Sequence, residues 1–235
     1  MRKRPKRPKE TPPPKPVEQT YEYEDIKVNP LNESQRKLIL SILTNDITIC
    51  CGVAGTGKTC VSVGMALKKL FAREAHKIII TRPAVYEGKG QGYLPGDISS
   101  KMAPYLIPIY DELKRYISHE RLANIVGLAN YDTNPMIEIV PLEFMRGRSI
   151  RKSIVVLDEA QNCTYTQLKN VLTRIGVGSK IIINGDPSQC DIPLDKSGLA
   201  SITEKLGDTQ GVGIVTMDNK DVVRHEIIER LLKVL

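Results

Sequence analysis

Eight consecutive residues, Gly52 to Thr59, are the part of this sequence whose types and spacing most clearly predict chemistry. They read Gly-Val-Ala-Gly-Thr-Gly-Lys-Thr and fit the pattern G-x-x-x-x-G-K-S/T of a phosphate-binding loop. The glycines let the backbone curl so that N–H groups converge on a phosphate, and the following helix points its positive end at the same place. The residues expected to surround the phosphates are Gly52, Val53, Ala54, Gly55, Thr56, Gly57, Lys58, Thr59 and Cys60.

Two carboxylates form a second chemical element, in the segment from Ile154 to Gln161. Asp158 is expected to hold Mg²⁺, directly or through water, together with the Thr59 hydroxyl, while Lys58 reaches the β- and γ-phosphates. Glu159 points the other way and is expected to orient and deprotonate the attacking water. A phosphate loop and a carboxylate pair in one chain predict Mg²⁺-dependent chemistry on a nucleoside triphosphate such as ATP.

Two glutamines complete the candidate site. Gln189 comes directly after Gly-Asp-Pro-Ser, the segment that follows the apolar run at 180–184. Its amide can donate to a γ-phosphate and accept from water, which predicts a sensor of hydrolysis; the alternative is an amide that stabilises the turn. Gln35 lies three residues after Asn32, a good helix N-cap. It fits two roles equally, as a cap on that helix or as a group that binds the edge of adenine.

Strands and helices in alternation must position these groups. Apolar, β-branched runs at 46–51, 77–81, 154–157 and 180–184 predict buried strands, and helical spacing follows the phosphate loop at 60–72. The polar residues come after the strands, at the carboxyl ends where open α/β sheets bind ligands. We therefore predict one α/β domain with a mostly parallel sheet, helices on both faces and right-handed crossovers. Further strands are predicted at 136–140 and 211–217, and further helices at 101–117, 119–126, 197–206 and 222–235.

The net charge of +7 is unevenly distributed along the 235 residues. Residues 1–16 hold seven basic side chains, one acidic side chain and six prolines, which predicts a disordered basic arm. This arm either aids solubility or contacts phosphate backbones, and the two roles stand equally. A linker or strap is expected over 17–30 and the folded domain over 31–235. The arginines at 146 and 148 are candidates for a phosphate or subunit contact, with a solvated turn as the alternative.

The composition also bears on where the protein is located and on whether its cysteines bind a metal or form disulfides. No apolar run approaches the ~18 residues of a membrane span, so no membrane partner is expected. The charged first residues lack the apolar segment of a secretory signal, which favours the cytoplasm. The five cysteines form no C-x-x-C pair and are expected to be free thiols.

These pieces, in this order, resemble the nucleotide-binding domain of superfamily 1 helicases and, within that group, the PhoH-like ATPases. The resemblance covers residues 31–235. It implies a RecA-like sheet in which the strand before Gln189 lies between the strands that lead to Gly52 and Asp158. It also implies ATP hydrolysis with Mg²⁺ and action on RNA or single-stranded DNA. The segments that carry it are Thr81-Arg-Pro-Ala-Val85, Gly92-Tyr-Leu-Pro-Gly-Asp97, Pro141-Leu-Glu-Phe-Met-Arg-Gly-Arg148, Leu157-Asp-Glu-Ala-Gln-Asn162, Gly185-Asp-Pro-Ser-Gln189 with Asp191, and Asp221-Val-Val-Arg-His225.

The resemblance further implies an assembly. Superfamily 1 helicases draw an arginine from a second domain across the ATP, and these 235 residues leave no room for one. A homo-oligomer is therefore expected, in the form of a ring and on family resemblance a hexamer, with Arg224 supplied by a neighbouring subunit. Some relatives carry a nuclease or a nucleic-acid-binding domain that has no counterpart here, so strand separation and RNA cleavage are not carried over. A bacterial or bacteriophage-infected host cytosol is the expected location.

Two other interpretations share the phosphate loop. In the first, ATP is a switching ligand that controls oligomer assembly, with slow turnover and no helicase activity; Glu159 argues against it, because a switch has little need of a positioned base. In the second, the chain is a small-molecule kinase. Gln189 and the Asp-Glu-Ala-Gln run, which resemble helicase motifs, argue against the kinase, as does the lack of an arginine-rich lid.

Overall fold

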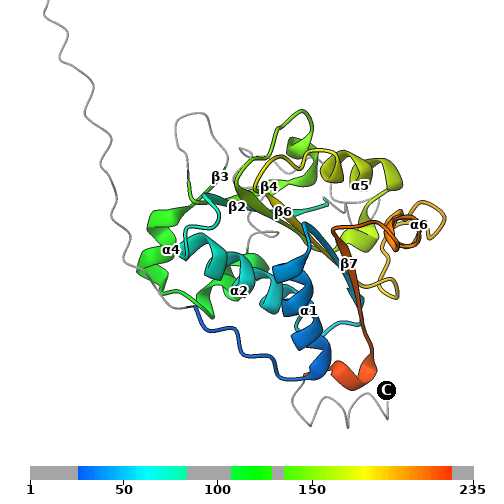
Figure 1. Ribbon diagram of the computed structural model, residues 1–235, viewed down its shortest axis with the longest axis horizontal. Helices are drawn as coiled ribbons and strands as arrows, with labels where there is room; N and C mark the ends of the chain where they lie inside the picture. Colours follow the sequence, from blue (N-terminus) through cyan, green and yellow to red (C-terminus); the bar gives the residue numbers. More distant parts are fainter. Residues whose placement is uncertain (1–25, 84–106, 129–134, 224–235) are drawn as a thin grey trace, which may run out of the picture.

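The computed structural model describes residues 26–83, 107–128 and 135–223, and Figure 1 shows these as a coloured ribbon. Within these ranges one parallel sheet of seven strands has the order β3-β4-β2-β5-β6-β1-β7. The strands are β1 Ile47–Gly52, β2 Lys77–Arg82, β3 Val126–Leu128, β4 Ile137–Pro141, β5 Ser153–Leu157, β6 Lys180–Gly185 and β7 Val212–Met217. The predicted α/β class and parallel sheet are confirmed.

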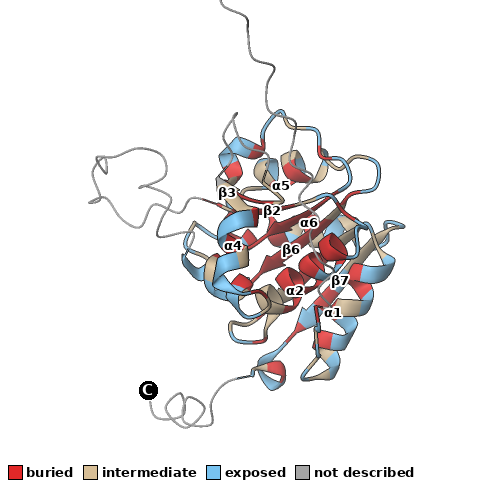
Figure 2. Ribbon diagram, turned by 90° about the vertical axis from the view of Figure 1, so that its left-hand side faces the viewer, coloured by how far each residue is buried: buried red, intermediate tan, exposed pale blue. Residues whose placement is uncertain are grey.

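Helices cover both faces of this sheet, as Figures 1 and 2 show. α1, α2 and α4 lie on one face, and α5 and α6 lie on the other. Their bounds are α1 Glu33–Thr44, α2 Lys58–Phe71, α4 His119–Ile125, α5 Tyr165–Leu172 and α6 Leu199–Leu206, and residues 107–114 are also helical. None of the helices in the described ranges is long and apolar enough to cross a bilayer.

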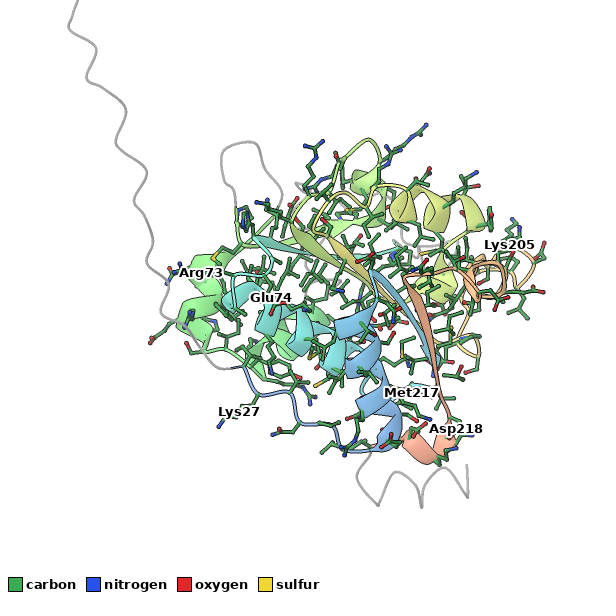
Figure 3. The ribbon with its side chains drawn as sticks, viewed as in Figure 1. Lys27, Arg73, Glu74, Lys205, Met217 and Asp218 are labelled. Carbon is green, nitrogen blue, oxygen red and sulfur yellow. The ribbon has the colours of Figure 1, made fainter. Side chains whose placement is uncertain are left out.

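The alternation of side chains along each strand builds two cores from one sheet. In β2, Ile78 and Ile80 pack toward α1 and α2, whereas Ile79 packs toward α5 and α6. This is the period of two that an extended chain imposes, and apolar residues on both faces mark a strand that helices cover twice. Each buried Ile, Leu or Val adds about 1.5–3 kcal/mol over the exposed side chain. Side chains fill the space between the sheet and the helices on both faces (Figure 3).

The strand order brings the polar residues together at one edge. β6 pairs with β1 on one side and with β5 on the other, as the resemblance implied for the strand before Gln189. β2 pairs with the far side of β5, with Thr81 opposite Leu157. Because all four strands are parallel, the residues that follow them meet at the carboxyl edge of the sheet.

Several elements differ from the prediction. The strand β3 was not predicted because three residues are too short to show alternation, and the eight-residue helix α5 was not predicted because it offers only a few apolar positions. α6 begins at Leu199 and not at Ser197. The predicted cap of α1 is confirmed, since the Asn32 side chain accepts from the Gln35 N–H at 2.8 Å. The helix predicted at 222–235 lies outside the described residues, apart from residues 222 and 223, which form no helix.

Candidate active site

The phosphate loop connects β1 to α2 in a tight curve. Gly55 and Gly57 have φ angles of +83° and +82°, in the left-handed region that side chains other than glycine rarely adopt. A Cβ atom on Gly57 would also stand 2.6 Å from the Gln35 Nε2 atom. The glycines of the predicted loop are therefore required by the backbone at these two positions.

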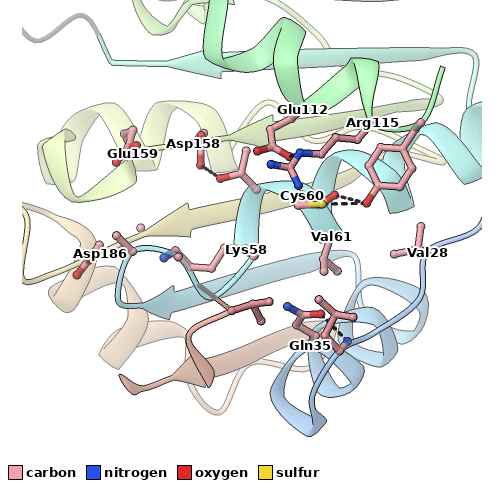
Figure 4. Close-up of a pocket in the computed structure, with 18 of the residues that line it drawn as sticks. Val28, Gln35, Lys58, Cys60, Val61, Glu112, Arg115, Asp158, Glu159 and Asp186 are labelled. Carbon is pink, nitrogen blue, oxygen red and sulfur yellow. Dashed lines mark hydrogen bonds and ion pairs between the residues drawn. The ribbon is translucent and has the colours of Figure 1, made fainter. Parts of the chain in front are cut away.

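Lys58 lies inside the curve of the loop (Figure 4). Its Nζ donates to the carbonyl oxygens of Gly52 at 2.6 Å and Val53 at 2.9 Å. An ammonium group held in this way is placed where a phosphate would enter the loop. The position fits the role predicted for Lys58, because three N–H donors on a flexible stem can exchange carbonyl partners for phosphate oxygens.

The two predicted metal ligands touch each other. The Thr59 hydroxyl donates to Asp158 Oδ1 at 2.8 Å, although 99 residues separate the two in the sequence. Asp158 is only 3% exposed, and its other oxygen accepts two hydrogen bonds from Arg82, at 3.1 Å from Nε and 2.5 Å from Nη2. A hydroxyl and a carboxylate oxygen side by side are ligands that Mg²⁺ prefers, so these residues fit the metal that the chemistry implies.

Glu159 stands at the mouth of the site, next to the buried Asp158. Its backbone is left-handed, with φ of 57°, which costs a residue other than glycine on the order of 1–3 kcal/mol. This turn exposes the Glu159 side chain while its neighbour stays buried. The two carboxylates therefore have separate surroundings, which the different roles predicted for them require.

Gln161 connects the groups around Glu159 and was not predicted as a site residue. Its Nε2 donates to Glu159 Oε2 at 2.7 Å and to the Gln189 carbonyl at 3.1 Å. Its Oε1 accepts from the Asp186 N–H at 2.9 Å, and the residue is 1% exposed. Its position as the last residue of the Asp-Glu-Ala-Gln run was the available signal.

Gln189 lies on the wall of the same cavity, in the turn after β6. Asp186 supports this turn, because its Oδ1 accepts from the Ser188 N–H at 3.0 Å and from the Ser188 hydroxyl at 2.6 Å. Asp186 Oδ2 is buried and has no hydrogen-bond partner among the described residues. Asp186 thus stabilises this turn, and the Gln189 side chain is exposed at the cavity, where its role as a sensor stays a prediction.

Gln35 ties the loop to the chain before α1. Its Oε1 accepts from the Leu31 N–H at 2.8 Å, and its Nε2 donates to the Thr56 carbonyl at 2.9 Å. The side chain is 4% exposed and also lines the cavity. The contact with the Leu31 N–H reaches back along the chain, as the capping role predicted, but to the residue before Asn32, while the Nε2 group holds the phosphate loop. The binding of adenine stays a prediction.

A cavity of about 360 Å³ joins these groups and extends beyond the phosphate loop, as Figure 4 shows. This volume lies within the range of small-molecule sites. Its far wall contains Val28, Glu112, Arg115 and Tyr116, which belong to no motif and were therefore not predicted. The Tyr116 hydroxyl donates to the Cys60 carbonyl at 2.9 Å, and burial raises the pKa of that hydroxyl.

The predicted arginines have different outcomes. Arg224 lies outside the described residues; the preceding Val223 donates its N–H to the Gly55 carbonyl at 2.9 Å, so the chain reaches the phosphate loop at that point. Arg148 forms an ion pair within the chain that was not predicted, and the phosphate or subunit contact considered for it stays a prediction. It donates to both oxygens of Glu138, at 2.6 and 2.8 Å, and Glu138 is only 3% exposed. A buried carboxylate needs such a partner, which sequence spacing does not reveal. Arg146 is exposed.

The comparisons with known proteins cover most of the chain. The family model for PhoH-like proteins matches residues 27–235. A PhoH-like protein of Synechocystis sp. is 42% identical over 200 residues, which are 85% of this chain and 59% of that protein. A PhoH-like protein of Bacillus subtilis is also 42% identical over 200 residues, which are 85% of this chain and 61% of that protein. The chain therefore spans about three fifths of the length of these relatives.

Similarity to solved structures is weaker. The Sulfolobus solfataricus SWI2/SNF2 ATPase core in complex with dsDNA aligns with 84% of this chain and 47% of that chain, with a TM-score of 0.48 and 15% identity. The fold described above rests on the strand order and the loop geometry of this chain.

Proposed function

Because the chain belongs to the PhoH-like protein family, we propose that it is a Mg²⁺-dependent ATPase that couples hydrolysis to binding of RNA or single-stranded DNA within a homo-oligomer. Membership of the family supports nucleotide binding, and the geometry of the site supports metal binding and hydrolysis. One observation carries the proposal. The hydrogen bond of 2.8 Å between Thr59 and Asp158 unites the phosphate loop and the carboxylate pair in one cavity.

The residues divide the work of the reaction. The loop N–H groups and Lys58 bind and orient the phosphates, while Thr59 and Asp158 would hold Mg²⁺. When bound, the metal neutralises negative charge on the phosphates and on the leaving group. Glu159, exposed at the cavity mouth, takes a proton from the attacking water, and Gln161 fixes the position of that carboxylate. Gln189 orients the water and detects the terminal phosphate.

Two parts of the proposal concern other molecules. Arg224 of a neighbouring subunit stabilises charge in the transition state, since positive charge at that point accelerates phosphoryl transfer. The basic arm of residues 1–16 contacts the phosphate backbone of a single strand, because this segment has seven basic side chains and only one acidic side chain.

The test is steady-state ATP hydrolysis by the purified protein, alone and with single-stranded RNA or DNA. Glu159→Gln is the inactive blank, and Glu143→Gln, an exposed carboxylate outside the cavity, is the matched control. We expect hydrolysis that a single strand stimulates, that the blank loses and that the control retains. Hydrolysis that no single strand changes would contradict the coupling, and wild-type hydrolysis in the blank would contradict the site.

A second function, in which ATP controls assembly with slow turnover, is supported by the hydrogen bond from the Val223 N–H to the Gly55 carbonyl. This bond joins the phosphate loop to the segment that leads to Arg224, the residue proposed to act at a subunit boundary. An oligomer size that changes on ATP binding, together with negligible hydrolysis by the wild type, would support this function over the first.

A further inference from the structure

Arg82 contacts the proposed metal ligand Asp158, and the reaction above does not use it. It is the last residue of β2, and the backbone holds it opposite its partner: Thr81 pairs with Leu157, and the Asp158 N–H donates to the Thr81 carbonyl at 3.0 Å. The two side chains therefore leave neighbouring strands from matched positions. The Arg82 side chain is 17% exposed and that of Asp158 is 4% exposed.

The two oxygens of Asp158 have different partners. Both contacts from Arg82, by Nε and by Nη2, go to Oδ2, whereas Oδ1 accepts only the Thr59 hydroxyl among the described contacts. Both N–H donors on Oδ2 come from the one guanidinium, which places a positive charge on that side of the carboxylate. Only Oδ1 is directed toward the loop, beside the second predicted metal ligand. Asp158 is thus presented to a cation through one oxygen.

Divalent cations differ in whether they bind a carboxylate through one oxygen or through both. Mg²⁺ is small and octahedral, keeps several waters and is satisfied by single carboxylate oxygens, whereas Ca²⁺ takes six to eight oxygens and readily accepts both oxygens of one carboxylate. A positive guanidinium on Oδ2 also repels a second cation from that oxygen. Both effects disfavour the larger ion more than the smaller one.

We propose that Arg82 sets the metal selectivity of this site, because it holds Asp158 as a one-oxygen ligand and so favours Mg²⁺ over Ca²⁺. Arg82 is a positioning residue and acts through Asp158. The inference rests on the proposed nucleotide site, since the metal is expected to arrive with the nucleotide. Partners of ligating carboxylates change metal affinity by about 10- to 100-fold when they are removed, so an effect of this size is within reach.

The test is equilibrium binding of a fluorescent, non-hydrolysable ATP analogue, with Mg²⁺ and with Ca²⁺ at saturating concentration. The quantity is the ratio of the two dissociation constants, which a general loss of stability does not move. We expect the wild type to favour the Mg²⁺ complex and Arg82→Gln to shift the ratio by about tenfold or more toward Ca²⁺. Arg82→Lys, which keeps a positive donor for Oδ2, is expected to shift it less.

Arg148→Gln is the matched control, because it breaks the same kind of ion pair with a buried carboxylate at a position away from the cavity. Its ratio should equal that of the wild type. Thermal melting shows that each variant is folded, and Arg82→Met replaces Arg82→Gln if the amide prevents folding. An unchanged ratio in a folded, uncharged Arg82 variant would overturn this inference alone. Failure of the wild type to bind the analogue with either metal would overturn the proposed function together with it.

Discussion

At the scale of single residues, Gln161 gives the sharpest prediction. Replacing it with Met leaves the Asp186 N–H buried without a partner and releases Glu159. We expect the turnover number to fall at least tenfold, nucleotide affinity to change little, and the free energy of unfolding to drop by about 1–3 kcal/mol. Steady-state kinetics and urea unfolding measure these quantities.

Gln167→Met is the control for this prediction. Its side chain accepts from the Thr164 N–H at 2.8 Å in the cap of α5, away from the cavity. It should lose stability and retain turnover. Equal turnover in both variants would show that Gln161 only supports the fold.

The buried pair of Glu138 and Arg148 predicts a pH dependence of stability. Burial alone would raise the pKa of the Glu138 carboxyl, but the hydrogen bonds and charges of Arg148 and Lys77 outweigh burial and lower it. Its contribution is therefore complete above the unfolded-state pKa of about 4.3 and is lost as the pH falls through the lower folded-state value. Unfolding free energy measured from pH 6 to pH 3 should fall less steeply in Glu138→Gln. Parallel curves of unfolding free energy against pH for the two proteins would contradict a stabilising ion pair between Glu138 and Arg148.

Site residues that belong to sequence motifs could be predicted, whereas residues that act through tertiary hydrogen bonds could not. Lys58, Thr59 and Asp158 belong to two recognisable motifs that each follow a predicted parallel strand, so the sequence predicted that they would meet at one edge of the sheet. Arg82 and Gln161 act through hydrogen bonds between strands and turns, and these depend on the order of strands in the sheet. Gln35 had a recognisable position, but only the folded loop shows that Thr56 is its partner.

At the scale of elements, the start of α1 is joined to both the phosphate loop and the segment after β7. Asn32 caps the helix and also donates from Nδ2 to the Asp221 carbonyl at 2.9 Å. We expect Asn32→Ala to lower the unfolding free energy by about 1–3 kcal/mol, because a cap and a second hydrogen bond are lost. Asn32→Asp keeps the cap and loses only the donor, so it should lie between. Denaturant unfolding of the three proteins distinguishes these values, and a neutral Asn32→Ala would contradict the junction.

Long apolar strands were predicted because burial on both faces leaves an unmistakable run of β-branched residues, as in β2, β5 and β6. The order of those strands came from the family resemblance, since local pattern carries no information on which strand pairs with which. Short elements such as β3 and α5 depend on packing against neighbours and have too few residues to show a period.

At the scale of the whole molecule, the proposed trans role of Arg224 makes a prediction about mixed oligomers. Arg224→Ala and Glu159→Gln should each be inactive alone. If each site takes Glu159 from one subunit and Arg224 from its neighbour, random mixing restores a complete set to about a quarter of the sites of a closed ring. Hydrolysis by co-purified mixtures, compared with either variant alone, measures the recovery. No recovery would place the arginine in its own subunit, whose Val223 already bonds to Gly55.

The central claim, that the cavity at the carboxyl edge of the sheet binds ATP and that Glu159 drives its hydrolysis, is tested most directly by single-turnover measurement. Limiting radiolabelled ATP is bound with Mg²⁺ to excess wild type or to excess Glu159→Gln, and its conversion to ADP is followed in time. We predict that both proteins bind the ATP and that the variant converts it on the order of 10²- to 10⁴-fold more slowly, the contribution of a general base. Equal conversion in the two proteins, or no binding by either, would contradict the claim.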